Sequence, residues 1–364
     1  APPWSACSGA SPTTPSTAVF EAERQNIFRR LPLLACLSSD VPSIGSAFLF
    51  EDAGPSILIL RNANGVEAFL NMCTHRGAKL VESAGTYRRL TCPFHAWTFG
   101  IDGRVLAIPG AKAFSDIDRD CRSLVRVPCA EWNGMIFVKA HAGQERIDVE
   151  AYLGDFATEL AMIDFSGLSR VASDRIDVAA NWKTALDTYL ECYHFATLHR
   201  DGLALTHLSD VMIHDAVDPH CRVSYSPREF VQWSKLPEEQ WPVRIYEGVH
   251  LLFPNTIVNI NDFEGQVSLG LYRLFPADSV GRAYSTMTTY APTKLPPDRS
   301  IEEWQAGHAF VVNTVRNEDY TVAETGWHNL SRHSEPFKLI LGRNELGLQA
   351  LHRNIAKFSG VPLD

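Results

Sequence analysis

Between about residues 31 and 140, short apolar runs alternate with pairs of turn-forming residues. Asn64-Gly65, Asp102-Gly103 and Asn133-Gly134 each separate two such runs, and this arrangement is typical of β-hairpins. The predicted strand pairs are 56–60 with 66–70, 97–99 with 105–108, and 124–127 with 135–138. Three hairpins with few helical patterns indicate a small antiparallel β domain.

The pattern changes after about residue 147. Residues 181–198 carry apolar positions at helical spacing, namely Trp182, Ala185, Leu186, Tyr189 and Tyr193. Ser300 and Glu303 form a capping-box pair that predicts the start of another helix, and a last helix is expected near 344–357. Strand-like runs at 249–260, 267–275 and 283–290 lie between these helices. Together they predict an α+β domain.

Composition narrows the class of protein. The chain has 364 residues, of which 45% are hydrophobic, and this length predicts two domains. The formal net charge of −9 argues against binding to a nucleic-acid backbone. No apolar run approaches the ~18 residues of a membrane span. We therefore expect neither nucleic acid nor a membrane as a partner.

The N-terminus and the cysteines bear on location. Residues 1–17 are rich in Pro, Ser and Thr and lack the basic and apolar regions of a signal peptide, so they predict a loose tail. Eight cysteines in a chain of this length do not make a disulfide scaffold. A cytoplasmic location is the expectation.

Two segments place cysteine and histidine at metal-ligand spacing. They read Cys73-Thr74-His75 and, after sixteen intervening residues, Cys92-Pro93-Phe94-His95. Thiolates suit one iron of a diiron–disulfide cluster, and neutral imidazoles suit the other. Structural zinc also accepts two thiolates and two imidazoles, although zinc sites rarely interleave the ligands in this way. The spacing favours an iron–sulfur cluster, with zinc as the alternative.

A polar stripe marks the predicted helix at 181–198. At 100° per residue, Asp187, Glu191 and His194 fall about 120° to 180° from Trp182 on its apolar face. On an unbroken helix His199 would lie about 140° from His194, so the helix must end or bulge between them if both bind one ion. Two histidines and a carboxylate form the facial triad of mononuclear non-haem Fe(II). A solvated polar face is the alternative.

Both segments resemble known motifs. Cys73–Gly77 and Cys92–Trp97 are similar to the two loops of a Rieske 2Fe–2S domain, with Ala96 where many relatives carry Gly. A second resemblance, to the catalytic segment of Rieske non-haem iron oxygenase α subunits, is carried by Asn181-Trp182-Lys183, Glu191-Cys192-Tyr193-His194 and His199. The resemblance covers about residues 30 to 330.

The resemblance implies two metal centres. The implied ligands are Cys73, His75, Cys92 and His95 for the 2Fe–2S cluster, and His194, His199 and Asp319 for mononuclear Fe(II). In relatives the third iron ligand is an Asp on a C-terminal helix, usually within a short acidic pair. The matching stretch is Arg316–Tyr320, which makes Asp319 the expected ligand, while Glu318 and Glu324 are the alternatives.

Two acids depart from the commonest family pattern. The acid that connects the two metal sites is most often Asp in ring-dihydroxylating relatives, whereas Glu191 stands there in this chain, as in members that act on quaternary ammonium compounds. It is expected to bind neither metal and to accept hydrogen bonds from His194 and from His95 of a neighbouring subunit. Asp187, where many relatives place Asn, is expected to hydrogen-bond a ligand histidine, and attraction of a cationic substrate is the alternative.

The resemblance also implies an architecture. It consists of a small antiparallel β Rieske domain and an α+β catalytic domain whose central antiparallel sheet is flanked by helices. The expected division is residues 1–30 as tail and lead-in, 31–146 as the Rieske domain and 147–364 as the catalytic domain. A head-to-tail homotrimer is expected, or a trimeric α subunit with a β subunit encoded elsewhere.

The implied function is that of a terminal oxygenase. It would use O2 and electrons from NAD(P)H to hydroxylate or oxidatively demethylate a small aromatic or quaternary ammonium substrate. The family includes enzymes of aromatic hydrocarbon catabolism. Because the sequence has no flavin or nicotinamide fingerprint, the electrons would arrive through a separate reductase, with or without a ferredoxin. The alternative is an electron-transfer or metal-scaffold protein with an inactive catalytic domain. About three irons per chain would indicate the oxygenase, and two the electron carrier.

Overall fold

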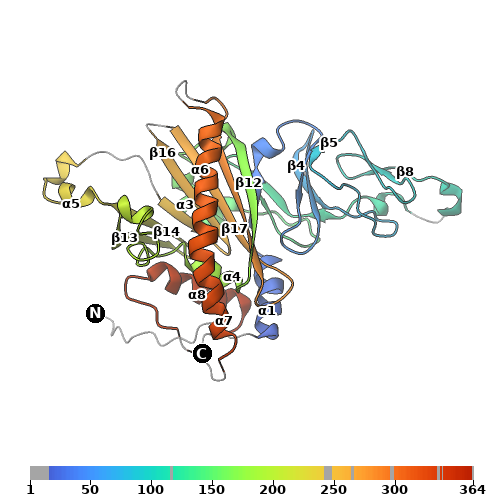
Figure 1. The fold of residues 1–364 in the computed structure, drawn as a ribbon. Coiled ribbons are helices and arrows are strands. Elements are labelled where there is room, and N and C mark those ends of the chain that lie inside the picture. Colours follow the sequence, from blue (N-terminus) through green and yellow to red (C-terminus); the bar gives the residue numbers. More distant parts are fainter. Residues whose placement is uncertain are drawn as a thin grey trace. The chain divides into compact units, whose positions relative to one another are not determined.

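The computed structural model describes residues 16–114, 118–241, 248–263, 266–295, 299–333, 337 and 339–362 (Figure 1). The chain divides into two compact units, one formed by Phe28–Ser169 and the other by Ala1–Ile27 with Arg170–Asp364. We call them the β unit and the α+β unit. The expected fold class, antiparallel sheets with helices in the second domain, is confirmed.

The β unit contains three antiparallel sheets. Their strand orders are β5-β2-β3-β4-β9, β1-β11-β10 and β6-β7-β8. The strands are β1 (Leu33–Leu37), β2 (Ser46–Phe50), β3 (Ile57–Asn62), β4 (Gly65–Leu70), β5 (Gly85–Thr86), β6 (Leu90–Thr91), β7 (Thr98–Phe99), β8 (Val105–Ala107), β9 (Arg126–Val127), β10 (Cys129–Trp132) and β11 (Met135–Val138). The first two predicted hairpins are confirmed as β3–β4 and β7–β8.

The third predicted hairpin has a different first strand. β11 pairs with β10, whereas the predicted run at 124–127 contributes only β9, which pairs with β4. The turn consists of Asn133 (φ 46°) and Gly134 (φ 81°), both left-handed, so Trp132 must pair directly with Met135. A two-residue turn pairs the two residues that directly flank it, so the first strand of this hairpin is β10 and not the predicted run at 124–127.

The β unit extends past the predicted boundary at residue 146. Two short helices, α2 (Val149–Leu153) and α3 (Asp155–Leu160), belong to it. The side chain of Asn133 donates hydrogen bonds of 2.8 Å to the carbonyls of Leu160 and Ile163. These bonds join the helical segment to the β10–β11 turn, and the structural division falls at Ser169.

The α+β unit is built on a seven-stranded antiparallel sheet of order β12-β18-β17-β16-β15-β14-β13. Its strands are β12 (Leu168–Val178), β13 (His207–Val217), β14 (His220–Pro227), β15 (Gly248–Leu252), β16 (Thr256–Phe263), β17 (Gln266–Pro276) and β18 (Ala283–Pro292). The predicted run 249–260 is two strands, because a turn containing Pro254, which has no amide N–H, separates them. The two following predicted strands are confirmed, while β12, β13 and β14 were not predicted.

Helices cover this sheet and gather at one end of it. α6 (Ile301–Thr314) runs along one face in Figure 1, and its predicted Ser300–Glu303 capping box is confirmed. A π-helical turn, Val315–Asp319, joins it to α7 (Tyr320–Leu330). The remaining helices are α1 (Thr17–Glu23), α4 (Trp182–Asp187), α5 (Phe230–Trp233) and α8 (Leu346–Ser359), the last close to its predicted range. No helix among the described residues is long and apolar enough to cross a membrane.

Helix α4 ends eleven residues earlier than the predicted 181–198, and the predicted polar stripe is therefore wrong. Asn181 caps its N-terminus by accepting a hydrogen bond from the Lys183 amide, as expected of an N-cap. After Asp187 the chain continues in turns. The Glu191 carboxylate accepts hydrogen bonds from two backbone amides, those of Tyr193 and His194, which would otherwise serve a helix.

The N-terminal helix is attached to α4 by a buried ion pair. Most of the predicted tail, residues 1–15, lies outside the described residues, but α1 follows directly and ends at Glu23. The Glu23 carboxylate accepts a hydrogen bond of 2.5 Å from the Lys183 ammonium and one of 2.8 Å from the Trp182 indole. Both charged side chains are at most 1% exposed. α1 is therefore a structural part of the α+β unit.

We expect Glu23→Ala to destabilise the α+β unit by about 3–5 kcal/mol, because it leaves the Lys183 ammonium buried without its counter-charge. The measurement is urea denaturation followed by tryptophan fluorescence. Glu21→Ala on the same helix removes an exposed pair with Arg24 and should change stability by at most about 0.5 kcal/mol. Equal losses in the two variants would contradict a structural role for the buried pair.

Candidate functional site

The first predicted metal site lies in two loops of the β unit, one after β4 and one between β6 and β7. Each loop is a tight turn around a cysteine: the Gly77 amide donates to the Cys73 carbonyl at 2.9 Å, and the Ala96 amide donates to the Cys92 carbonyl at 3.0 Å. Both cysteines are buried. Burial raises the pKa of the Cys73 thiol, and the neighbouring Cys92 thiol raises it further. The loops thus bring the two thiols together.

The two histidines of these loops also meet. The rings of His75 and His95 have centroids 4.7 Å apart, and His75 stacks on the buried Trp97 at 4.8 Å with an interplanar angle of 5°. Desolvation lowers the pKa of His75, as do the nearby His95 and Arg76, and this favours the neutral imidazole that binds metals. The His95 side chain is exposed.

These four side chains fit an iron–sulfur cluster with mixed ligands. Buried Nδ1 of His75 has no hydrogen-bond partner among the described residues, as expected for an atom that coordinates a metal. Two thiols and two imidazoles are the donor set of a Rieske centre. Ala96 lies in the left-handed region with φ 56°, a conformation that favours glycine. This backbone conformation explains why many relatives carry Gly at the position of Ala96.

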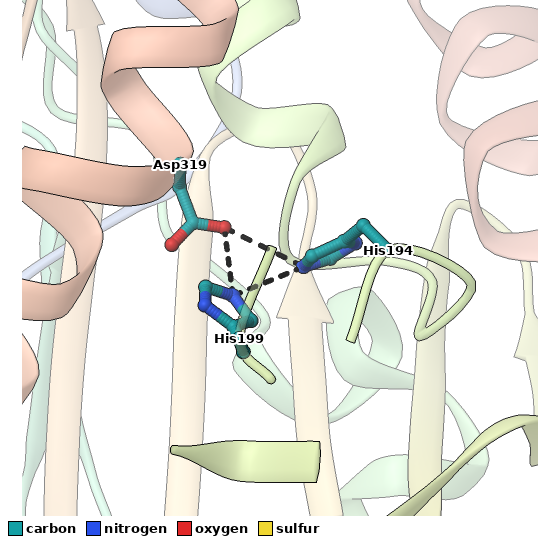
Figure 2. A group of neighbouring side chains, drawn as sticks. All are labelled: His194, His199 and Asp319. Atoms are coloured by element: carbon teal, nitrogen blue, oxygen red, sulfur yellow. Dashed lines mark hydrogen bonds and ion pairs between the residues drawn. The ribbon is translucent and has the colours of Figure 1, made fainter. Parts of the chain in front are cut away.

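The second predicted site lies in the α+β unit, where His194, His199 and Asp319 converge (Figure 2). The two Nε2 atoms are 3.2 Å apart. Asp319 Oδ1 lies 3.5 Å from Nε2 of His194 and 3.4 Å from Nε2 of His199. His199 and Asp319 are buried. Two imidazole nitrogens and one carboxylate oxygen therefore point to one position, as a 2-His-1-carboxylate site requires.

The outward nitrogens of both histidines contact carboxylates. Nδ1 of His194 is hydrogen-bonded to Glu191, and Nδ1 of His199 to Glu318 at 2.7 Å. Burial acts to lower the pKa of His199, but its hydrogen bonds and charge interactions with Asp319 and Glu318 outweigh this and raise it. In each case Nδ1–H donates, and the Nε2 lone pair is left free for a metal.

The acidic alternatives to Asp319 lie elsewhere. Glu318 contacts the far side of His199, and Glu324 accepts a hydrogen bond from the Ala179 amide. The π-helical turn Val315–Asp319 aims two successive carboxylates at the same histidine, one at each ring nitrogen. π-turns are frequent at functional sites, but no pattern in the sequence announces this one.

Asp187 has a different neighbour from the one expected. Its carboxylate oxygens lie 3.0 and 3.1 Å from Nε2 of His352 on α8. The expectation that Asp187 hydrogen-bonds a ligand histidine is therefore wrong, because His352 is not among the predicted ligands. Asp187 does not line the cavity either, and this disfavours direct contact with a substrate. No spacing in the sequence pairs Asp187 with His352, since 165 positions separate them.

A cavity of about 290 Å³ opens beside the three converging side chains. Its described walls carry no lysine or arginine, and their sole carboxylate is that of Asp319. Burial raises the pKa of the tyrosines there, so their phenols are neutral. The aromatic side chains of the wall are Tyr189, Phe195, His207, Tyr225, Tyr272 and Phe310, and its amides are Asn259 and Asn261.

Comparison with protein families identifies both units. Residues 165–360 match the ring-hydroxylating α subunit catalytic domain, and residues 32–129 match the Rieske [2Fe–2S] domain. The chain belongs to the ring-hydroxylating oxygenase α subunits. In this family a Rieske cluster and a mononuclear iron are the cofactors, and the enzymes are oxidoreductases that use O2. The β unit of this oxygenase α subunit is its Rieske domain, and the α+β unit is its catalytic domain.

Individual relatives are more distant. This oxygenase α subunit is 31% identical over 188 residues to the carnitine monooxygenase oxygenase subunit of Acinetobacter pittii. The matched segment covers 50% of each of the two chains. The α subunit is 28% identical over 253 residues to the glycine betaine monooxygenase oxygenase subunit of Pseudomonas aeruginosa, covering 69% of this chain and 57% of the relative. The matched segments thus span little more than half the length of these relatives.

A solved structure has the same fold over almost the whole chain. The quaternary ammonium Rieske monooxygenase CntA, in complex with L-carnitine, superimposes with a TM-score of 0.80. The match covers 97% of this chain and 96% of that chain, at 20% sequence identity. Another similar structure, of a quaternary ammonium Rieske monooxygenase, is described as giving insight into carnitine oxidation and inter-subunit electron transfer; it has a TM-score of 0.78 at 21% identity.

Proposed function

We propose that this chain is the terminal oxygenase of a system that oxidises a quaternary ammonium substrate at an N-methyl or neighbouring C–H bond. The observation that carries the proposal is the aromatic cavity next to His194, His199 and Asp319. Aromatic rings attract quaternary ammonium groups through cation–π interactions. The names of the relatives, carnitine and glycine betaine monooxygenases, point to the same substrate class.

The ring arrangement supports a cationic substrate. Phe195 lies 5.0 Å from the His194 ring and 5.0 Å from the Tyr225 ring, and so connects the metal-binding residues to the aromatic wall. Tyr189 and Tyr272 form a second aromatic pair at 6.0 Å. The described wall residues include no lysine or arginine, so no cationic side chain of these types opposes a cationic substrate there. A quaternary ammonium group held by these rings would lie beside the triad.

The proposed ligands are those expected from the sequence. Cys73, His75, Cys92 and His95 would hold the cluster, and His194, His199 and Asp319 the mononuclear iron. The cluster would supply electrons, and the iron would activate O2. Within this scheme the chain's own carboxylates have defined tasks. Glu191 and Glu318 would hold both imidazoles with Nε2 toward the metal, while the aromatic rings of the wall, among them the buried Phe195 and Tyr272, would limit the access of water to the substrate.

Glu191 has the further proposed task of connecting two subunits. Its oxygens accept hydrogen bonds from His194 Nδ1 and from two backbone amides, and a carboxylate offers about four acceptor positions. One position thus remains for the exposed His95 of another copy. We therefore propose a head-to-tail homotrimer with electron transfer between subunits. A reductase would supply electrons, with or without a ferredoxin; a β subunit and the cytoplasmic location remain predictions.

Oxygen uptake with a reconstituted reductase tests the substrate class. We expect NADH-dependent uptake with carnitine, glycine betaine or choline, and none above background with benzoate or anthranilate. Uptake confined to the aromatic acids would replace the proposal with ring hydroxylation. A chain that carries about two irons and supports no uptake with any of these compounds would be an electron carrier instead.

A further inference from the structure

The C-terminal helix α8 contacts residues 187–194 at two points. This segment carries Glu191 and His194. At the first, Nε2 of His352 faces the Asp187 carboxylate at 3.0 and 3.1 Å. At the second, Gly347 packs so closely on Leu190 that an added Cβ would lie 2.8 Å from the Leu190 carbonyl oxygen. The two contacts flank the turn that begins with the Leu190 amide donating to the Asp187 carbonyl at 3.1 Å.

Among the described residues, Asp187 is the hydrogen-bond partner of the His352 side chain. His352 is 5% exposed, and the buried Nδ1 atom of its ring has no hydrogen-bond partner among the described residues. A polar ring is costly to bury unless it is hydrogen-bonded. The bond to Asp187 is therefore the contact that accounts for a histidine at this position, with Nε2–H donating to the carboxylate.

The segment held by α8 is short and carries the site. Thr188 and Tyr189, directly after Asp187, line the cavity. Glu191 follows and binds both the amide and Nδ1 of His194. Because no helix runs through this segment, its position depends on such contacts from outside. A shift at Asp187 or Leu190 would be passed on to His194 through Glu191.

We propose that His352 and Gly347 make α8 a positioning element for the mononuclear metal site. His352 acts through Asp187, and Gly347 acts by allowing α8 to approach Leu190. Neither residue touches the metal ligands. The proposal rests on the proposed metal site, and it assigns Asp187 a supporting role in place of contact with substrate.

The test is metal binding by holoenzyme whose cluster is intact and whose mononuclear iron has been removed by chelation. Co(II) binding is followed by calorimetry, and the Co(II) EPR spectrum of the oxidised protein reports the ligand geometry. We expect His352→Phe and Gly347→Ala each to lower the Co(II) affinity by at least about 10-fold, the low end of the effect of groups that support metal ligands. His352→Gln keeps a donor for Asp187 and should restore most of the affinity.

Two matched variants control for a general loss of stability. His308→Phe removes a second buried histidine, which lies on α6 away from residues 187–194. Its Nε2 is hydrogen-bonded to Asp174 at 3.0 Å. Gly326→Ala adds a methyl group on α7, where nothing lies within 4 Å of the new Cβ. Both should keep the wild-type affinity and spectrum.

The outcomes separate the two proposals. Wild-type affinity in both His352→Phe and Gly347→Ala, or equal losses in the controls, would overturn the positioning role. If His352→Phe does not fold, Gly347→Ala decides, since alanine favours a helix. Failure of the wild-type chain itself to bind one Co(II) would overturn the proposed metal site instead.

Discussion

Asp319→Ala is expected to abolish substrate-dependent oxygen uptake and to lose the mononuclear iron while the cluster keeps its visible spectrum. Asp319 Oδ1 lies within 3.5 Å of Nε2 of both histidines, and Asp319 is the sole carboxylate on the described cavity wall. Without it, two neutral imidazoles remain for a divalent cation. The loss of affinity should therefore exceed the roughly 100-fold upper range for residues that only support ligands.

Glu318→Ala is the matched comparison, because the neighbouring carboxylate contacts the same histidine from its other side at 2.7 Å. Loss of that contact removes the partner of Nδ1 but no proposed ligand, so iron affinity should fall only about 10- to 100-fold. Iron analysis and oxygen uptake measure both effects. Full iron content and activity in Asp319→Ala, with loss of both in Glu318→Ala, would move the ligand by one residue.

Glu191→Gln is expected to keep the cluster, the iron and the oligomeric state yet to lose most steady-state turnover. The Glu191 carboxylate accepts from three N–H groups of Tyr193 and His194. A glutamine amide replaces one acceptor oxygen with a donor NH2, which faces an N–H group unfavourably. In a single turnover with substrate and O2, reoxidation of a pre-reduced cluster should slow at least ~10²-fold, the upper range for a group that only supports a metal ligand, because Glu191 is also proposed to connect the two subunits.

Glu318→Gln provides the control for this experiment. It makes the same change at the other carboxylate that contacts a ligand histidine through Nδ1, but it has no proposed part in connecting subunits. Its cluster should reoxidise faster than that of Glu191→Gln. Wild-type reoxidation in Glu191→Gln, or equal slowing in both variants, would leave Glu191 with the orientation of His194 as its whole task.

Local patterns in the sequence predicted local structure. The Asn64-Gly65 and Asp102-Gly103 hairpins and the Ser300–Glu303 capping box are formed as expected, because each is fixed by backbone geometry within a few residues. The same reasoning failed for the helix at 181–198. Its apolar spacing is helical, but the chain after Asp187 forms turns, in which the Glu191 side chain accepts hydrogen bonds from two backbone amides and α8 packs on Leu190.

The sequence by itself determined the family, because the cysteine and histidine pairs of the Rieske loops and the histidines after α4 are close in the chain and specific in type. The resemblance favoured Asp319 over Glu318, but only the tertiary structure shows how the two acids differ: the π-helical turn places Asp319 beside Nε2 of His199 and Glu318 beside Nδ1. Tertiary structure also decided the supports of the site. Glu23 meets Lys183 across 160 positions and Asp187 meets His352 across 165. Such contacts arise from the packing of whole helices, and no periodicity or spacing encodes them.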